Sequence, residues 1–219
     1  MINYFTNKDI INDIVITPLE LETIFNHTRL NKEEIDSIKL ILNECKRLPA
    51  SLNYHGRYRG GLFDHTLLVI NFSYHLWYKD NILKHFKDFF LNKNLNFSKD
   101  YSELDLSKII RTALYHDFGK IPYYAVKTKL CNRNIFITNK LDLAVKKEIQ
   151  ERFDLKGKDR YVERTIGILK RYSLPYDDEI YLSIIFHHGK WSKYKPPKGN
   201  KLSELIHLAD MIASNYYYI

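Results

Sequence analysis

The sequence predicts an all-α fold, and three observations support this class. Apolar side chains recur at helical spacing through most of the longer segments. Eight glycines and six prolines among 219 residues are too few for the many turns of an all-β chain. Hydrophobic residues make up 45% of the chain and charged residues 27%, a balance typical of a globular protein. At this length we expect one domain, or one domain with a short N-terminal extension.

The helical pattern divides the chain into segments separated by polar or irregular stretches. In chain order, the predicted helices span residues 18–26, 32–48, 62–78, 106–117, 141–153, 160–172, 175–188 and 202–217. The second helix illustrates the pattern, because Ile38, Ile41 and Leu42 belong to one apolar stripe. Residues 81–91 either extend the third helix or form a short helix of their own.

Residues at the expected helix ends support several of these boundaries. Thr17 is a possible N-cap for the first helix. Three acidic residues at positions 177–179 fall in the first turn of the helix that starts at Pro175, where the helix dipole favours anions. Gly119 follows the apolar run 106–117 and is a good C-cap residue.

One stretch departs from the helical pattern. Two runs of β-prone residues, 124–130 and 135–138, flank a polar turn at 131–134. Strands joined by such a short polar turn form a hairpin. We therefore expect a small β-hairpin insertion around residues 123–139.

The chain carries a net charge of +8, from 34 Lys and Arg against 26 Asp and Glu. This excess is compatible with a polyanionic ligand such as RNA, DNA or a nucleotide. It is equally compatible with a solvated, lysine-rich surface, so charge alone does not decide between the two.

Two further features bear on location. The sequence has no apolar run of about 18 residues and no signal-peptide stretch at its N-terminus, so we expect no membrane association. Cys45 and Cys131 are isolated and lack the spacing of a disulfide framework or a zinc site. We therefore expect a protein of the reducing cytoplasm.

Several histidines and aspartates have the composition of a metal site. His65 lies early in a predicted helix. His116 and Asp117 are adjacent at the end of another helix, and Asp210 lies far downstream. Two imidazoles and two carboxylates suit an octahedral Mn, Fe, Co or Mg site that keeps positions open for water and substrate. If these side chains converge, we expect a metal-dependent hydrolase.

The order and context of these residues resemble the HD superfamily of metal-dependent phosphohydrolases. Residues 60–65 read Gly-Gly-Leu-x-x-His, residues 116–120 read His-Asp-x-Gly-Lys, and an Ala-Asp pair ends at Asp210. A His-His pair precedes that last aspartate, as in some members of the superfamily. The resemblance covers roughly residues 50–216.

The resemblance implies a domain division, a ligand set and a catalytic role for two residues. Residues 1–49 would be a helical extension packed on the bundle, and residues 50–219 an HD-domain helical bundle. The implied ligands of a divalent metal ion (Mn, Fe, Co or Mg) are His65, His116, Asp117 and Asp210. Asp117 would also bridge to a second ion. Lys120 resembles the family lysine that faces the substrate phosphate, although an isolated lysine there could simply satisfy carbonyls at a helix end.

The sequence does not decide whether the site binds a second metal ion. Some members of the superfamily bind two ions with additional histidines, and His187 and His188 stand where such members have a His-His pair. The remaining extra histidine of those members corresponds to Glu163 here. A carboxylate still binds a hard cation, so the resemblance is compatible with one or two ions per chain.

Two basic segments are candidates for substrate binding. The lead-in 48–62 resembles that of HD-type 3′-to-5′ exoribonucleases and of the HD domains associated with conjugative relaxases. In that comparison His55 and Arg59 contact substrate phosphate. In the second segment, 190–201, basic residues alternate with aromatic ones and could provide phosphate contacts and base stacking; the candidates are Lys190, Trp191 and Lys193. The alternative for both segments is an exposed basic loop.

Two functional hypotheses follow. In the first, the chain is a phosphohydrolase or phosphodiesterase that cleaves a phosphoester bond of a nucleotide or a single-stranded nucleic acid by attack of metal-activated water. In the second, it is a catalytically inactive HD-derived module that binds nucleic acid or another partner. The complete ligand set favours the enzyme, and no Walker, dinucleotide-binding or Gly-x-Ser-x-Gly fingerprint indicates another activity. Oligomeric state and physiological substrate stay open.

Overall fold

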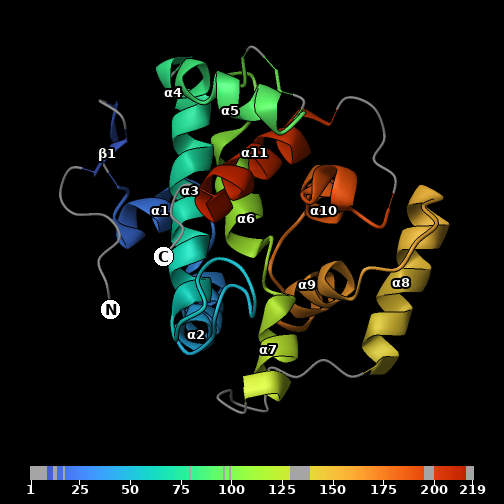
Figure 1. The fold of residues 1–219 in the computed structure, drawn as a ribbon. Coiled ribbons are helices and arrows are strands. Elements are labelled where there is room, and N and C mark those ends of the chain that lie inside the picture. Colours follow the sequence, from blue (N-terminus) through green and yellow to red (C-terminus); the bar gives the residue numbers. More distant parts are fainter. Residues whose placement is uncertain are drawn as a thin grey trace.

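The chain folds into a helical bundle, which confirms the predicted all-α class (Figure 1). The computed structural model describes residues 9–11, 14–16, 18–78, 80–95, 97–98, 100–128, 139–194 and 200–215. The α-helices are α1 (Leu21–Thr28), α2 (Lys32–Cys45), α3 (Gly61–Tyr78), α4 (Asp80–His85), α5 (Lys87–Asn92), α6 (Leu106–Tyr115), α7 (Lys120–Thr128), α8 (Asn139–Phe153), α9 (Arg160–Arg171), α10 (Asp178–Phe186) and α11 (Lys201–Asn215). The 3-10 turn η2 (Gly189–Trp191) follows α10. Near the N-terminus, β1 (Asp9–Ile11) and β2 (Ile14–Ile16) form a short antiparallel ribbon.

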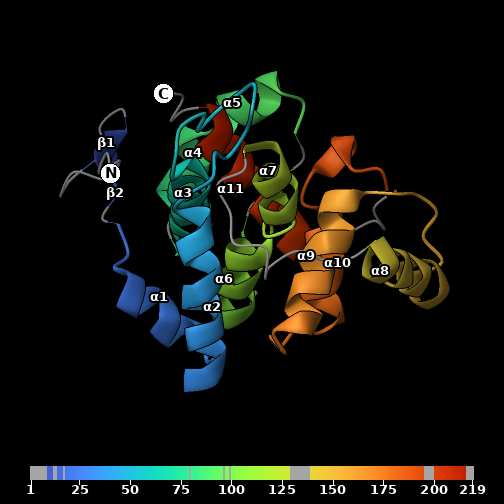
Figure 2. The ribbon, with the colours of Figure 1, turned by 90° about the horizontal axis from the view of Figure 1, so that it is seen from below.

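Helix α3 is the centre of the bundle. It packs against α6 and α11, which lie beside it in both views (Figures 1 and 2). Val69 and Phe72 are fully buried, and the helix is apolar on most faces, as expected for an element surrounded by others. The buried Asn71 is satisfied on both sides, because it accepts the Leu19 N–H at 2.7 Å and donates to the Leu67 carbonyl at 2.9 Å.

Helices α1 and α2 pack on the bundle. Helix α1 contacts α6, helix α2 contacts α3, and their buried residues, including Ile24 and Ile38, belong to the same core. A capping box fixes the start of α2, where Asn31 accepts the Glu34 N–H and Glu34 accepts the Asn31 N–H. This packing agrees with a helical extension that covers one side of the bundle, while the boundary at residue 49 stays a prediction.

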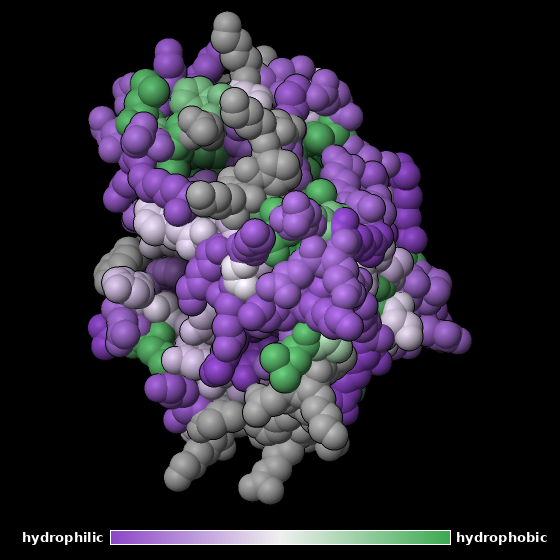
Figure 3. All heavy atoms as spheres, turned by 90° about the vertical axis from the view of Figure 1, so that its right-hand side faces the viewer, coloured by the Kyte–Doolittle hydropathy of each residue, from purple (hydrophilic) through white to green (hydrophobic). Residues whose placement is uncertain are grey.

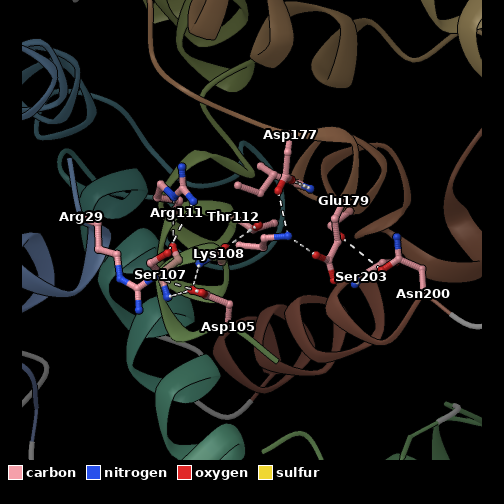
Figure 4. Close-up of polar contacts among 12 residues, drawn as sticks. Arg29, Asp105, Ser107, Lys108, Arg111, Thr112, Asp177, Glu179, Asn200 and Ser203 are labelled. Carbon is pink, nitrogen blue, oxygen red and sulfur yellow. Dashed lines mark hydrogen bonds and ion pairs between the residues drawn. The ribbon is translucent and has the colours of Figure 1, made fainter. Parts of the chain in front are cut away.

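Ion pairs link α6 to its neighbours (Figure 4). Lys108 Nζ lies 2.8 Å from Asp177 Oδ2 and 2.6 Å from Glu179 Oε2, at the start of α10. Arg29, which follows α1, pairs with Asp105 at 3.2 Å. Pairs this exposed contribute about 0–1 kcal/mol each, so they orient the helices more than they stabilise them.

Several predicted helix ends differ from the structure. Helix α1 starts at Leu21 rather than residue 18, and its N-cap, Glu20, makes no side-chain capping bond. Helix α10 starts later than predicted, because the Asp177 side chain accepts the Ile180 N–H and caps it. Helix α6 ends at Tyr115, before the predicted end. The stretch after α3 forms the separate short helices α4 and α5.

The predicted hairpin insertion is wrong over the residues that the structure describes. Residues 123–128 belong to α7, and residues 129–138 lie outside the described part of the chain. Ile121, Tyr124 and Ala125 are buried at helical spacing, and α7 packs against α9. Burial of this face therefore outweighs the β preference of the local sequence.

The surface seen from the side of α8 is largely hydrophilic, with small hydrophobic areas scattered over it (Figure 3). None of the described helices combines the length and the apolar character needed to cross a membrane. Cys45 is buried, and Cys131 lies outside the described residues.

Candidate metal centre

The four predicted metal ligands meet in the interior of the bundle. His65 comes from α3, His116 and Asp117 from the turn between α6 and α7, and Asp210 from α11. His65 Nε2 lies 3.1 Å from Asp210 Oδ1 and 3.5 Å from Asp117 Oδ2. His116 Nε2 lies 3.3 Å from the same Asp117 oxygen. Ligand atoms about 2.1 Å from an octahedral cation lie about 3 Å apart at adjacent positions, so the spacing of His65, His116 and Asp117 fits a shared ion. Asp210 contacts His65 but does not belong to that group of mutually close donor atoms.

His116 and His187 occupy equivalent positions, each at the C-cap of its helix. In both, Nδ1 faces the backbone carbonyl three residues earlier, at 2.6 Å from the Ala113 oxygen and 2.7 Å from the Ile184 oxygen. A carbonyl only accepts hydrogen bonds, so the proton resides on Nδ1 and Nε2 keeps a lone pair. Metal-binding histidines are commonly oriented in this way.

Several buried polar atoms of this cluster make no hydrogen bond to any described residue. They are both ring nitrogens of His65, Nε2 of His116, Nε2 of His187 and Oδ2 of Asp117; of these, His65 Nε2 and Asp117 Oδ2 lie within ion-pair distance of Asp210 and Lys120. Each of these four side chains is almost completely buried. An unsatisfied buried polar group costs about 1–3 kcal/mol, and so many together are unfavourable without a common partner. Because each of the three imidazoles can offer one lone pair and Asp117 a carboxylate oxygen, the set fits a divalent cation.

The donor atoms form two overlapping groups. His65, His116 and Asp117 offer atoms that all lie within 4.8 Å of one another, and so do Asp117, His187 and His188. Asp117 belongs to both groups, which fits a carboxylate that bridges two ions. The structure thus brings the predicted His-His pair close to His116 and Asp117, which we call the dyad.

Glu163, the third predicted ligand of a second ion, belongs to neither of these described groups. Its Oε1 instead accepts the Asp159 N–H at 3.1 Å and the Tyr194 hydroxyl at 3.0 Å. These two contacts hold the carboxylate against the loop before α9, so the structure does not bring Glu163 to the other predicted ligands.

Asp159 is a residue of this region that sequence reasoning missed. Its Oδ2 lies 3.8 Å from His188 Nδ1, and its side chain also caps α9 by accepting the Tyr161 N–H at 3.1 Å. Burial would raise the pKa of Asp159, but the neighbouring His188 and the backbone N–H groups lower it. Its position just before a predicted helix is a typical N-cap signal, but nothing in the sequence relates it to the His-His pair.

Burial and neighbouring charges set the protonation of the cluster. Burial would raise the pKa of Asp117, but the Lys120 ammonium and the adjacent imidazole hold it well below its usual value. Burial would also raise the pKa of Asp210, but the interaction with His65 holds it well below. For His187, burial lowers the pKa well below the usual value. Ionised carboxylates and a neutral imidazole are the forms that bind a divalent cation.

Lys120 lies at the edge of the cluster, where the resemblance places it. Its Nζ is 2.5 Å from Asp117 Oδ2, and its side chain is 14% exposed. Burial would lower the pKa of Lys120, but the charges of Asp117 and Asp210 raise it, so the group is an ammonium ion. It is positioned to balance the charge of an anion bound beside the cluster.

Gly119 has a different role from the predicted C-cap. Helix α6 has already ended, and the Gly119 N–H donates to Thr165 Oγ1 on α9 at 2.8 Å. A Cβ at this position would lie 1.8 Å from the Tyr161 carbonyl oxygen. Only glycine therefore allows the dyad segment to pack this closely against α9.

Of the two predicted substrate contacts in the lead-in, the structure places His55 beside the cluster but not Arg59. The His55 ring lies 4.7 Å from the His65 ring, and its Nε2 lies 3.5 Å from Ser214 Oγ on α11. Burial, with a smaller effect of His65, lowers the pKa of His55 to about 3, so it is neutral. Arg59 is exposed, and no contact in the described part of the chain links it to the cluster.

The second basic segment lies partly beside the cluster. Lys190 Nζ sits 5.0 Å from the centre of the Trp191 ring and donates to a backbone carbonyl at 3.2 Å. Trp191 is 55% exposed and its ring lies 5.8 Å from that of His207. Lys193 lines a hollow between α7 and α9. Residues 195–199 lie outside the described residues.

The types of donor atom in the cluster determine which metal ions it can bind. Imidazole and carboxylate donors, without a thiolate among the described residues of the cluster, suit Mn, Fe, Co or Mg rather than a soft metal. The overlapping groups provide donors for one or two such ions, with Lys120 beside them.

Comparisons with protein-family models, with curated proteins and with solved structures find no match to this chain.

Proposed function

We propose that this protein is a metal-dependent phosphohydrolase that cleaves a phosphoester bond of a nucleotide or a single-stranded nucleic acid. The observation that carries the proposal is the buried cluster of lone-pair donors without hydrogen-bond partners, with an ammonium group at its edge. The order of these residues along the chain resembles the HD superfamily, and the distances between them support a shared ion.

The residues of the cluster have complementary roles in this reaction. A divalent cation bound by them lowers the pKa of a coordinated water and polarises a phosphoryl oxygen. Asp117 and Asp210 together match the formal charge of one divalent cation, so Lys120 or a second ion provides the positive charge that attracts an anion. Lys120 donates to a phosphoryl oxygen and balances the negative charge that develops there.

The surroundings of the cluster support a nucleotide or nucleic acid as the source of the phosphoester. The chain carries a net charge of +8. Trp191 exposes its ring beside Lys190 and His207, which joins an aromatic face to a cation near the cluster. Basic and aromatic side chains in such combination bind phosphates and stacked bases.

The test is a hydrolysis panel with purified protein and Mn²⁺ on bis-p-nitrophenyl phosphate, nucleotides and single-stranded oligonucleotides. We expect hydrolysis by the wild type and loss of both activity and bound metal in Asp117→Asn. Asp64→Asn is the matched control. Asp64 lies beside a ligand in sequence, but it belongs to neither donor group and accepts a bond from the Tyr58 hydroxyl at 2.9 Å, which asparagine preserves.

Two outcomes would contradict the proposal. Hydrolysis that survives Asp117→Asn would show that the cluster is not the catalytic site. Oligonucleotide binding by a protein that leaves every phosphate ester intact would support the alternative of an inactive nucleic-acid-binding module.

A further inference from the structure

A hollow of about 230 Å³ opens between α7 and the start of α9. Its lining residues, which define what we call the basic hollow, are Tyr123, Lys158, Arg160, Tyr161 and Lys193. None of the three cations forms an ion pair with an acidic group in the part of the chain that the structure describes. By contrast, Lys108, Lys170 and Lys201 all have carboxylate partners.

Buried contacts hold the two walls of the basic hollow together. A Cβ at Gly157 would lie 2.5 Å from the Lys193 carbonyl oxygen, so the loop before α9 closely approaches the segment after η2. The Tyr194 hydroxyl donates to Glu163 at 3.0 Å, and Glu163 also accepts the Asp159 N–H. These contacts keep cations from two distant parts of the sequence on the same hollow.

The acidic residue between two of these cations does not neutralise them. Asp159 lies between Lys158 and Arg160 in sequence, but its side chain is 5% exposed and faces inward, toward His188 and the first turn of α9. The hollow therefore keeps its positive charge, and the positive end of the α9 dipole adds to it.

Two contacts place the basic hollow next to the candidate metal centre. The backbone of Tyr161 packs against Gly119, which lies between Asp117 and Lys120 in the dyad segment. On the other side, Asp159 faces His188 of the second donor group. A ligand that extends out of the cluster over α7 and α9 therefore meets this hollow.

The hollow also offers aromatic faces. The half-buried rings of Tyr123 and Tyr161 make an edge-to-face contact at 5.2 Å and 76°, and Lys127 Nζ lies 5.6 Å from the centre of the Tyr123 ring. Tyrosine rings next to unpaired cations form the kind of surface on which a base stacks while its phosphate is neutralised.

We propose that the basic hollow binds a nucleotide unit next to the one whose phosphate lies at the metal centre, so that the substrate is a single-stranded nucleic acid rather than a mononucleotide. This inference rests on the proposed function for its substrate, but the binding that it predicts does not require turnover. Lys158, Arg160 and Lys193 contact phosphate oxygens, and Tyr123 and Tyr161 stack against a base.

The first experiment measures binding alone. Fluorescence anisotropy with a short labelled single-stranded oligonucleotide, in EDTA and over a range of salt concentrations, gives the dissociation constant and its salt slope. The triple variant Lys158→Ala, Arg160→Ala, Lys193→Ala should bind more weakly, and its salt slope should fall by about 2, since each lost phosphate contact on a single strand removes about 0.7.

The matched control removes the same charge elsewhere. Lys32, Lys84 and Lys87 are exposed cations on α2, α4 and α5, and none of them lines the basic hollow. Their triple alanine variant should keep most of the wild-type slope. Equal slopes in the wild type and the hollow variant, or equal losses in hollow and control variants, would overturn the proposal.

A second variant and a kinetic comparison separate this inference from the proposed function. Tyr123→Leu should weaken oligonucleotide binding without changing the salt slope, because stacking releases no counterions. In hydrolysis, the hollow variant should lose more kcat/KM on oligonucleotides than on bis-p-nitrophenyl phosphate; equal losses would contradict the inference. A reduced slope in a protein without any hydrolytic activity would refute only the proposed function, and normal hydrolysis with an unchanged slope would refute only the inference.

Discussion

At the scale of single residues, the candidate site depends on where two histidines lie on their helices. His116 and His187 are both C-cap residues, so each has a helix carbonyl three residues earlier within reach of Nδ1. That bond orients the ring and directs Nε2 to the centre of the bundle. The same local geometry therefore prepares one ligand for each donor group, and neither ring has to be positioned by a distant residue.

Substitution of Lys120 separates catalysis from metal binding. Lys120→Met keeps much of the apolar stem but removes the ammonium that lies 2.5 Å from Asp117. We expect bound metal close to the wild-type amount and a kcat on bis-p-nitrophenyl phosphate about 10²- to 10³-fold lower, the usual cost of losing one group that stabilises developing charge. Lys84→Met, at an exposed position on α4, is the control. An unchanged kcat would remove the proposed role of Lys120.

Metal counting tests which residues serve the second donor group. His188→Ala removes a donor that lies close to Asp117 and His187, so metal analysis should give a lower ratio of metal to chain than in the wild type. Glu163→Gln should leave the ratio unchanged, because the Glu163 carboxylate is bound to Asp159 and Tyr194 instead. The reverse result would restore Glu163 as a ligand and remove His188.

At the scale of elements, the approach of α7 to α9 is the contact with the least tolerance. Gly119→Ala would place a methyl group 1.8 Å from the Tyr161 carbonyl, and α9 would have to move away from the dyad. Overpacking of this kind costs about 1–3 kcal/mol. Urea unfolding should show a lower midpoint with an unchanged slope, and metal affinity should fall as well. A midpoint equal to that of the wild type would mean that the two helices separate easily here.

The helices show which features a sequence can and cannot predict. The central part of most helices follows from apolar spacing, because burial of one face is a local property of the sequence. Helix α7 does not, since its β-branched and aromatic residues favour a strand locally and its packing on α9 is not visible in the sequence. The grouping of His65, His116 and Asp117 as candidate ligands is predictable from motif order. The hydrogen bonding of Glu163 is not predictable, because its partner Tyr194 comes from a distant segment of the sequence.

At the scale of the whole molecule, the candidate metal centre joins elements from nearly the full length of the chain. Its residues come from α3, the α6–α7 turn, the end of α10 and α11, and these helices also share the core. The apolar core positions the helices, but it leaves several buried polar atoms of the cluster without partners. A cation that satisfies those atoms therefore contributes to the stability of the fold as well as to the site.

Removal of metal should consequently destabilise the entire protein. A ligand that binds only the folded state at about 100 times its Kd stabilises it by about 2.7 kcal/mol. For a chain of this size, each kcal/mol shifts Tm by about 2–4 °C, so EDTA should lower the Tm of metal-loaded protein by about 5–10 °C per ion. Asp117→Asn, which removes the carboxylate shared by both donor groups, should show no EDTA effect. If EDTA removes the metal and the wild-type Tm does not change, the buried polar atoms of the cluster do not need a cation for stability. The ion would then contribute to catalysis alone.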